Sequence, residues 1–123
     1  MTRLLKIMNL STTRHKKLKH AFSGQKLYVS NVLFKPIVIT NFEIAESSLH
    51  PGKEMLVAQV SFLADDGKAQ TGVLFTESYS LIDSIRNTED DLPHTTKIIR
   101  KSDRYYYFCQ LNKIELSKLK TIV

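Results

Sequence analysis

One predicted β-hairpin constrains the fold of this chain more than any other feature. From Met55 to Leu63 apolar and polar residues alternate, which is typical of a half-buried strand. The apolar face of this segment carries Leu56, Ala58, Val60 and Phe62. The turn that follows contains Asp66-Gly67, and Gly accepts the positive φ of a tight hairpin turn. Gln70–Thr76 is the expected return strand, with Thr71, Val73 and Phe75 on one side.

A helix is expected directly after this hairpin. Ser78 or Ser80 can cap its start, and Leu81, Ile82 and Ile85 form its apolar stripe. The segment 87–91, with its three acidic residues, and Pro93 end it. A second hairpin is predicted from a strand over 95–100 and its partner over 105–111, and a weak helix follows Asn112.

The expected fold is mainly β, with one or two helices. Residues 26–32 lead into a strand over 36–44, where β-branched residues dominate. The element order β-β-β-α-β-β predicts an OB-like, five-stranded and partly open barrel, although the same order also fits other α+β sheets. A chain of 123 residues suits one compact domain. We expect a basic N-terminal arm or helix over 1–23, the barrel over 24–111, and a C-terminal tail over 112–123.

Charge is distributed unevenly along the chain. Residues 1–42 carry +8 with no acidic residue, residues 43–96 carry −7, and residues 97–123 carry +5. If the two basic ends meet in space, one side of the domain attracts and orients a polyanion. The alternative is that the basic ends only keep the chain in solution.

Groups typical of catalysis or metal binding are missing from the sequence. Cys109 has no second cysteine as a partner, and the four histidines do not have the spacing of metal ligands. The four glycines are scattered, so no phosphate-binding loop is expected. We therefore expect a protein that is not an enzyme and needs neither a cofactor nor a metal. The lone cysteine fits a reducing compartment such as the cytoplasm, and no apolar run has the length of a membrane span.

The sequence favours nucleic-acid binding more than catalysis, and the residues that indicate it lie in the second predicted hairpin. Residues 97–108 combine cations with aromatic rings, and a single-strand binder needs both, because cations follow the phosphates and rings stack on bases. The expected phosphate contacts are Lys97, Arg100, Lys101 and Arg104. Strand pleating places Tyr105 and Tyr107 on one face, and we expect these two rings to stack on bases.

Three further candidates lie outside that hairpin. Phe75 is either on the binding side of its strand or in the core, and Tyr28 is a weaker stacking candidate. The N-terminal arm offers phosphate contacts, or is only a solvated face, through Arg14, Lys16, Lys17 and Lys19.

The chain resembles a group of small phage and mobile-element proteins that are similar to single-stranded-DNA-binding proteins. The resemblance lies in residues 24–30, in residues 73–78 followed by 81–83, and in residues 92–99 ahead of 105–108. It implies an OB-like barrel that coats single-stranded DNA during replication or recombination, in the host cytoplasm if the protein is phage-encoded. The chain departs from many bacterial single-strand binders, because its last residues are basic and apolar rather than acidic.

We therefore expect a non-catalytic single-stranded DNA-binding protein, with DNA preferred over RNA on the resemblance alone. A homodimer is a further possibility, because exposed edge strands can pair. The main alternative is a small β-barrel adaptor or inhibitor that binds another protein through the acidic middle of the chain or through a hydrophobic strand edge. An enzyme is the third alternative.

Overall fold

Six strands form one mixed sheet in the computed structural model, which describes residues 21–103 and 105–120. The strands are β1 (Gln25–Leu27), β2 (Pro36–Glu46), β3 (Glu54–Leu63), β4 (Ala69–Thr76), β5 (His94–Ser102) and β6 (Tyr105–Cys109). The helices are α1 (Val29–Val32), α2 (Tyr79–Ile85) and α3 (Lys113–Leu119), with a 3-10 turn η1 (Glu89–Asp91) after α2. The expectation of a mainly β protein is confirmed.

The strand order in the sheet is β1-β4-β3-β2-β5-β6. Strands β2, β3 and β4 follow one another as antiparallel neighbours, and β5 returns through α2 and η1 to lie antiparallel beside β2. Three consecutive antiparallel strands, with a fourth beside the first, make a Greek key. β6 extends this key on one side, and β1 adds a short parallel strand on the other.

The β3–β4 hairpin has the geometry that the sequence predicted. Eight residue pairs run from Leu56↔Thr76 to Leu63↔Ala69. Gly67 has φ of +82°, which explains the need for glycine in this turn. Leu56, Ala58, Val60 and Phe62 are all buried in the main core, as the alternation indicates.

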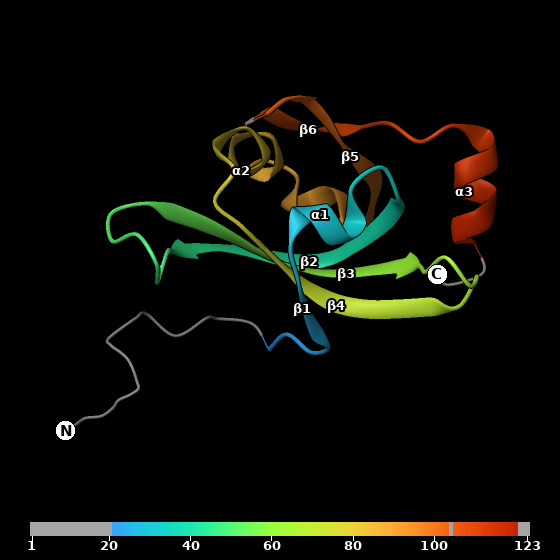
Figure 1. Ribbon diagram of the computed structural model, residues 1–123, viewed down its shortest axis with the longest axis horizontal. Helices are drawn as coiled ribbons and strands as arrows, with labels where there is room; N and C mark the ends of the chain where they lie inside the picture. Colours follow the sequence, from blue (N-terminus) through green and yellow to red (C-terminus); the bar gives the residue numbers. More distant parts are fainter. Residues whose placement is uncertain (1–20, 104, 121–123) are drawn as a thin grey trace.

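The main core lies between the two halves of the curled sheet. Figure 1 shows the β5–β6 hairpin on one side, strands β2 to β4 on the other, and α1 between them. Val32 of α1 and Ile98 of β5 are fully buried in this core, together with Leu74 of β4. Helix α2 closes it with Leu81, Ile82 and Ile85, the three residues of the predicted apolar stripe.

Helix α2 also joins two parts of the sheet that do not pair with each other. Its cap is Ser78, whose side chain accepts a hydrogen bond from the Leu81 amide, which confirms one of the two predicted caps. Ser80 Oγ donates a hydrogen bond of 2.5 Å to the Tyr106 carbonyl of β6. Because α2 directly follows β4, this bond holds β6 close to the end of β4.

Helix α3 packs on the opposite face of the sheet. The helix predicted after Asn112 is present, and Asn112 and Glu115 form a capping box at its start. Leu119 is buried against Val38 of β2 and Leu111, and these three residues make a small second core. The expected C-terminal tail therefore contributes a helix that packs against the sheet.

Two expectations about the strands need correction. Residues 26–32 do not lead into the next strand as β structure, because β1 ends at Leu27 and α1 begins at Val29. The sheet has six strands rather than five, and it is not closed into a barrel, because β1 and β6 do not pair within the described residues. The β-branched residues near Val29 favoured a strand locally, but burial of Val29 and Val32 in the core favours a helical turn.

Parts of two regions named from the sequence lie outside this description, the basic arm and residues 121–123 of the C-terminal tail. The segment 1–20 contains most of the expected basic arm and lies outside the described residues. The described chain begins at Ala21, and Ser23 is held on the outer face of β3 by two hydrogen bonds with the Gln59 side chain.

No helix in the described ranges has the length and apolar character needed to cross a membrane.

Candidate functional site

Strand β1 positions the first part of the candidate site. It pairs in parallel with β4, with Lys26 opposite Val73 and Leu27 opposite Leu74. Leu27 points into the core, so alternation places Lys26 and Tyr28 on the other face, beside Phe75. The Tyr28 amide donates a hydrogen bond of 2.8 Å to Asn31 Oδ1, which holds the backbone at the start of α1.

The close approach of β1 to β4 depends on two glycines. Gly72 lies against Leu27, and a Cβ atom on Gly72 would come within 2.6 Å of Leu27 Cδ1 and 2.7 Å of the Gln25 carbonyl. Gly24 has φ of +110°, and a Cβ atom there would meet the Thr71 carbonyl at 2.6 Å. Side chains larger than hydrogen at these positions would therefore push β1 away from β4.

Lys26 lies over two aromatic rings. Its Nζ atom is 5.5 Å from the centre of the Tyr28 ring and 5.0 Å from the centre of the Phe75 ring. Both distances fall within the range of cation–π attraction. The ammonium group occupies one side of each ring, and Tyr28 remains 54% exposed.

These three residues line one side of a pocket of about 450 Å³, which we call the ring pocket. Tyr106 of β6 contributes a third ring, and Met55 and Leu49 add apolar surface from β3 and the β2–β3 loop. Polar side chains come from Ser30, Ser48, Thr76 and Glu77. The ring pocket therefore lies where the β1–β4 end of the curled sheet comes near its β6 end.

The β5–β6 hairpin extends this surface with cations. Arg100 is the direct cross-strand partner of Tyr106, so the two side chains project from the same face. Lys101 is the extra residue of a β-bulge between Arg100 and Ser102. Both cations are exposed, and neither makes an ion pair with the rest of the described chain.

Tyr105 and Tyr107 occupy the opposite face of the same hairpin. They are 59% and 39% exposed, while Tyr106 and Phe108 pack against the main core. The predicted alternation of the aromatic run is therefore confirmed, and the two rings proposed to stack on bases are the accessible ones. The third ring of the ring pocket comes from Tyr106, on the face opposite Tyr105 and Tyr107.

Lys97 forms an ion pair with Glu115 of α3. Its Nζ atom lies 2.9 Å from Glu115 Oε2 of α3. Their hydrogen bond raises the pKa of Lys97 and lowers the pKa of Glu115. Lys97 therefore anchors α3, and a phosphate would have to compete with Glu115 for it.

Glu77 fixes the β2–β3 loop beside the ring pocket. It accepts a short hydrogen bond from Ser47 Oγ, and His50 Nδ1 lies 2.8 Å from Glu77 Oε1. Hydrogen bonds from Ser47 and His50 hold the pKa of the Glu77 carboxyl below its ordinary value. The same Ser47 hydroxyl accepts the amides of Leu49 and His50, which orders the loop.

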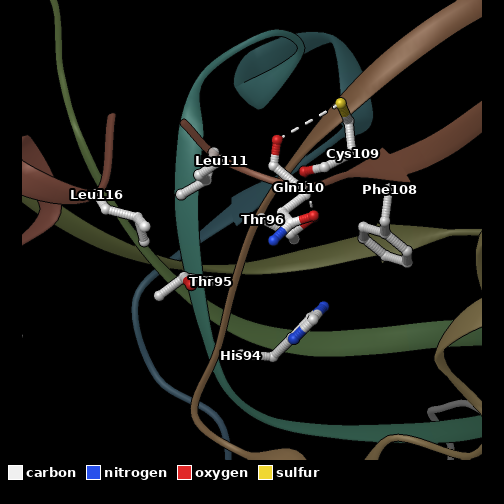
Figure 2. Close-up of a pocket in the computed structure, with 8 residues that line it drawn as sticks. All are labelled: His94, Thr95, Thr96, Phe108, Cys109, Gln110, Leu111 and Leu116. Carbon is white, nitrogen blue, oxygen red and sulfur yellow. Dashed lines mark hydrogen bonds between the residues drawn. The ribbon is translucent and has the colours of Figure 1, made fainter. Parts of the chain in front are cut away.

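A second pocket of about 460 Å³ lies between β5, β6 and α3 (Figure 2). His94 packs edge-on to the Phe108 ring, with the ring centres 6.4 Å apart. The Cys109 sulfur turns toward the Gln110 carbonyl, 3.6 Å away. Cys109 is half-buried, because it lies at the end of β6 on the same face as Tyr105 and Tyr107.

The structure brings together some of the predicted site residues and leaves others apart. Tyr28 and Phe75 meet at the ring pocket, and Arg100 lies on the hairpin face of Tyr106. Tyr105 and Tyr107 form a separate exposed pair, and Lys97 is bound to Glu115. The side chains of Arg14, Lys16, Lys17, Lys19 and Arg104 lie outside the described residues.

Sequence reasoning missed Lys26, Tyr106, Glu77 and Leu49 as pocket residues. The available signal for Lys26 was its spacing, because it lies two residues before Tyr28 and an extended chain places both side chains on one face. The pairing of β1 with β4, which brings both to Phe75, has no local signature in the sequence. In the described part of the chain, no group of three or more potential metal ligands comes together.

Comparison with known proteins identifies a family but no function. Residues 23–109 match the model of DUF8468, a domain of unknown function, and the chain belongs to this family. No curated protein and no solved structure matches the chain. The matched range begins beside β1 and ends with β6, so it contains every strand of the sheet and the whole ring pocket.

Proposed function

We propose that this protein binds single-stranded nucleic acid without catalysis, and that the ring pocket is its principal contact. One observation carries the proposal: Tyr28, Phe75 and Tyr106, from three separate segments, line one pocket together with the Lys26 ammonium. Rings accept stacked bases of any sequence, and a nearby cation can neutralise the phosphate of the same nucleotide.

The topology supports an OB-like reading of the fold. An OB-fold is a partly open five-stranded Greek-key barrel that binds oligonucleotides on the face of its second and third strands. Strands β2 to β6 contain a Greek key with a helix between the third and fourth members. Of the residues that line the pocket, Met55 comes from the second member, β3, and Phe75 from the third, β4. On this reading β1 is an addition to the five strands.

The proposed path of the strand runs from the ring pocket to the tip of the β5–β6 hairpin. Lys26, Arg100 and Lys101 would contact phosphates along it, and we propose a further phosphate contact for Arg104, which directly precedes β6 in the sequence. Tyr105 and Tyr107 would accept further bases when the bound strand is long enough to pass around the hairpin. Residues of the N-terminal arm, Arg14, Lys16, Lys17 and Lys19, would add phosphate contacts, and Lys97 would contribute least because it is bound to Glu115.

The biological role rests on the resemblance to small phage and mobile-element proteins. We propose that the protein coats single-stranded DNA in the cytoplasm during replication or recombination. The proposed ligand is DNA rather than RNA. The proposal also includes a homodimer, in which two copies pair through exposed edge strands.

A protein-binding role is the second candidate, and one observation favours it. Leu49 is 77% exposed at the rim of the ring pocket, next to the Glu77 carboxylate. An exposed apolar side chain beside an acidic group suits a basic, amphipathic segment of another protein. In this case the pocket would bind a side chain of the partner instead of a base.

A binding titration separates these functions. Labelled single-stranded DNA, duplex DNA and RNA of equal length are titrated with the full chain, and fluorescence anisotropy is recorded. We expect binding to single-stranded DNA with weaker binding to the duplex. Co-purification with and without nuclease tests the alternative, because a protein partner survives nuclease treatment and a partner held through nucleic acid is lost.

A further inference from the structure

The ring pocket contains one acidic group, and this carboxylate has acceptor capacity left over. Glu77 Oε2 accepts from Ser47 and lies 2.9 Å from His50 Nδ1. Glu77 Oε1 lies 2.8 Å from the same His50 nitrogen, and no other residue of the ranges 21–103 and 105–120 forms a hydrogen bond with it. A carboxylate oxygen accepts two hydrogen bonds, so Oε1 can accept one more from a molecule in the pocket.

Glu77 is ionised at neutral pH. Its hydrogen bonds with Ser47 and His50 lower the pKa of the carboxyl and also hold its position. An ionised carboxylate accepts hydrogen bonds and donates none. It also repels phosphate, so a nucleotide in the ring pocket would direct its base toward Glu77 and its phosphate toward Lys26.

The four DNA bases differ in what they offer to such an acceptor. Cytosine, adenine and guanine each carry an exocyclic amino group, which donates hydrogen bonds. Thymine and uracil present one N–H between two carbonyl oxygens, and these oxygens repel an approaching carboxylate. A fixed carboxylate acceptor therefore favours cytosine over thymine, two pyrimidines of similar size.

We infer that the ring pocket binds an unpaired base that carries an exocyclic amino group, and that Glu77 Oε1 accepts a hydrogen bond from this group. The inference rests on the proposed function and adds a base preference to it. Tyr28, Phe75 and Tyr106 supply stacking surface of no sequence preference. The hydroxyls of Ser30, Ser48 and Thr76 can each donate or accept, so they suit any base, and the preference comes from the Glu77 carboxylate.

The test compares oligo-dC with oligo-dT of equal length, binding to the wild-type chain and to Glu77→Gln. The amide keeps an oxygen for the Ser47 hydroxyl but loses the charge and offers N–H donors. We expect the wild type to bind oligo-dC about 5- to 10-fold more tightly, which corresponds to one good hydrogen bond to a base edge. Glu77→Gln is expected to reduce this ratio below about twofold.

The matched control is His50→Ala, which removes the other partner of Glu77 and keeps the carboxylate. This variant is expected to retain the preference for oligo-dC. Loss of the preference in His50→Ala would assign the effect to the order of the β2–β3 loop and overturn the inference. A third probe needs no variant: oligonucleotides of N4,N4-dimethylcytosine lack the amino hydrogens and are expected to bind the wild type no better than oligo-dT.

The results separate the two proposals. Equal affinity of the wild type for oligo-dC and oligo-dT overturns the base preference and leaves single-strand binding intact. An unchanged ratio in Glu77→Gln overturns the role of Glu77. Absence of binding to both oligonucleotides at low salt overturns the proposed function and this inference together.

Discussion

Lys26 Nζ of β1 lies 5.0 Å from the centre of the Phe75 ring of β4. This contact crosses a parallel strand pair, in which β1 adds three residues to the edge of an otherwise antiparallel sheet. A strand of three residues contributes little independent stability. Because β1 pairs with the strand that carries Phe75 and is directly followed by Tyr28, we infer that its role is to hold Lys26 and Tyr28 beside the Phe75 ring.

Replacement of Tyr28 by Ala tests the stacking role of the ring pocket. A base stacked on an aromatic ring contributes about 1–3 kcal/mol, so we expect Tyr28→Ala to weaken single-strand binding by roughly 5- to 150-fold. The ring is more than half exposed, so the melting temperature should change little. Tyr79→Ala is the matched control, because Tyr79 is 78% exposed on α2 and does not line the pocket. Equal effects of the two substitutions would exclude a specific role for the pocket.

Gly72→Ala tests whether binding depends on the contact between β1 and β4. The added Cβ atom meets Leu27 and the Gln25 carbonyl, so we expect a loss of about 1–3 kcal/mol in the free energy of unfolding. Affinity for single-stranded DNA should fall as well, because Lys26 and Tyr28 move with β1. Gly67→Ala is the control: its φ of +82° makes alanine unfavourable, but nothing lies within 4 Å of the new Cβ atom. Chemical denaturation and anisotropy at a temperature where both variants are folded measure the two effects, and unchanged binding in Gly72→Ala would contradict the role of β1.

The double variant Tyr105→Ala with Tyr107→Ala tests the outer face of the hairpin. Both rings are exposed and away from the main core, so the domain should remain folded. A strand of about four nucleotides fits the ring pocket alone, whereas one of about sixteen can also reach the hairpin. We therefore expect the double variant to weaken binding of the long oligonucleotide and leave the short one unchanged. Equal affinity for the long oligonucleotide in variant and wild type would show that bases do not stack on these two rings.

The ion pair between Lys97 and Glu115 predicts a specific pH dependence of stability. The Glu115 pKa is lowered in the folded chain, so its contribution is complete above the ordinary value of 4.5 and is lost as pH falls through the folded value. Glu115→Gln keeps the cap of α3 but removes the charge, so the melting temperature should fall at pH 7 and the loss on acidification should be smaller. The pKa of Glu77 is also lowered from 4.5, so Glu77 contributes to the loss of stability on acidification in the same way. This contribution remains in Glu115→Gln, so the variant still loses some stability at low pH.

Asp83→Asn is the control for this measurement, since Asp83 is exposed on α2 and makes no ion pair with the described residues. A melting profile of Glu115→Gln that follows the wild type between pH 3 and pH 7 would contradict a stabilising role for the pair.

Local patterns predicted most of the elements correctly. The alternation over Met55–Leu63, the cap at Ser78 and the capping box at Asn112 each depend on residues close in sequence. The aromatic run also alternated as expected, because strand pleating alone decides which rings share a face. These features could be predicted since their causes lie within a few residues.

The candidate site could be predicted only in part. Tyr28 and Phe75 were named from residue type, but their meeting depends on a parallel pair between β1 and β4, which needs a long connection and has no local signal. Tyr106 reaches the same pocket because Ser80 of α2 binds its carbonyl. Lys97 was named from its position among cations, yet its partner Glu115 comes from a helix that follows later in the chain.

The salt dependence of binding to single strands tests the central claim most directly. Full-length chain is titrated with labelled single-stranded and duplex oligonucleotides at several salt concentrations, and log K is plotted against log salt. With about four to six phosphates neutralised, we predict a slope of roughly −3 to −4 for the single strand and weaker binding of the duplex at every concentration. Binding that does not change with salt, equal binding of the duplex, or no binding at low salt would contradict the account.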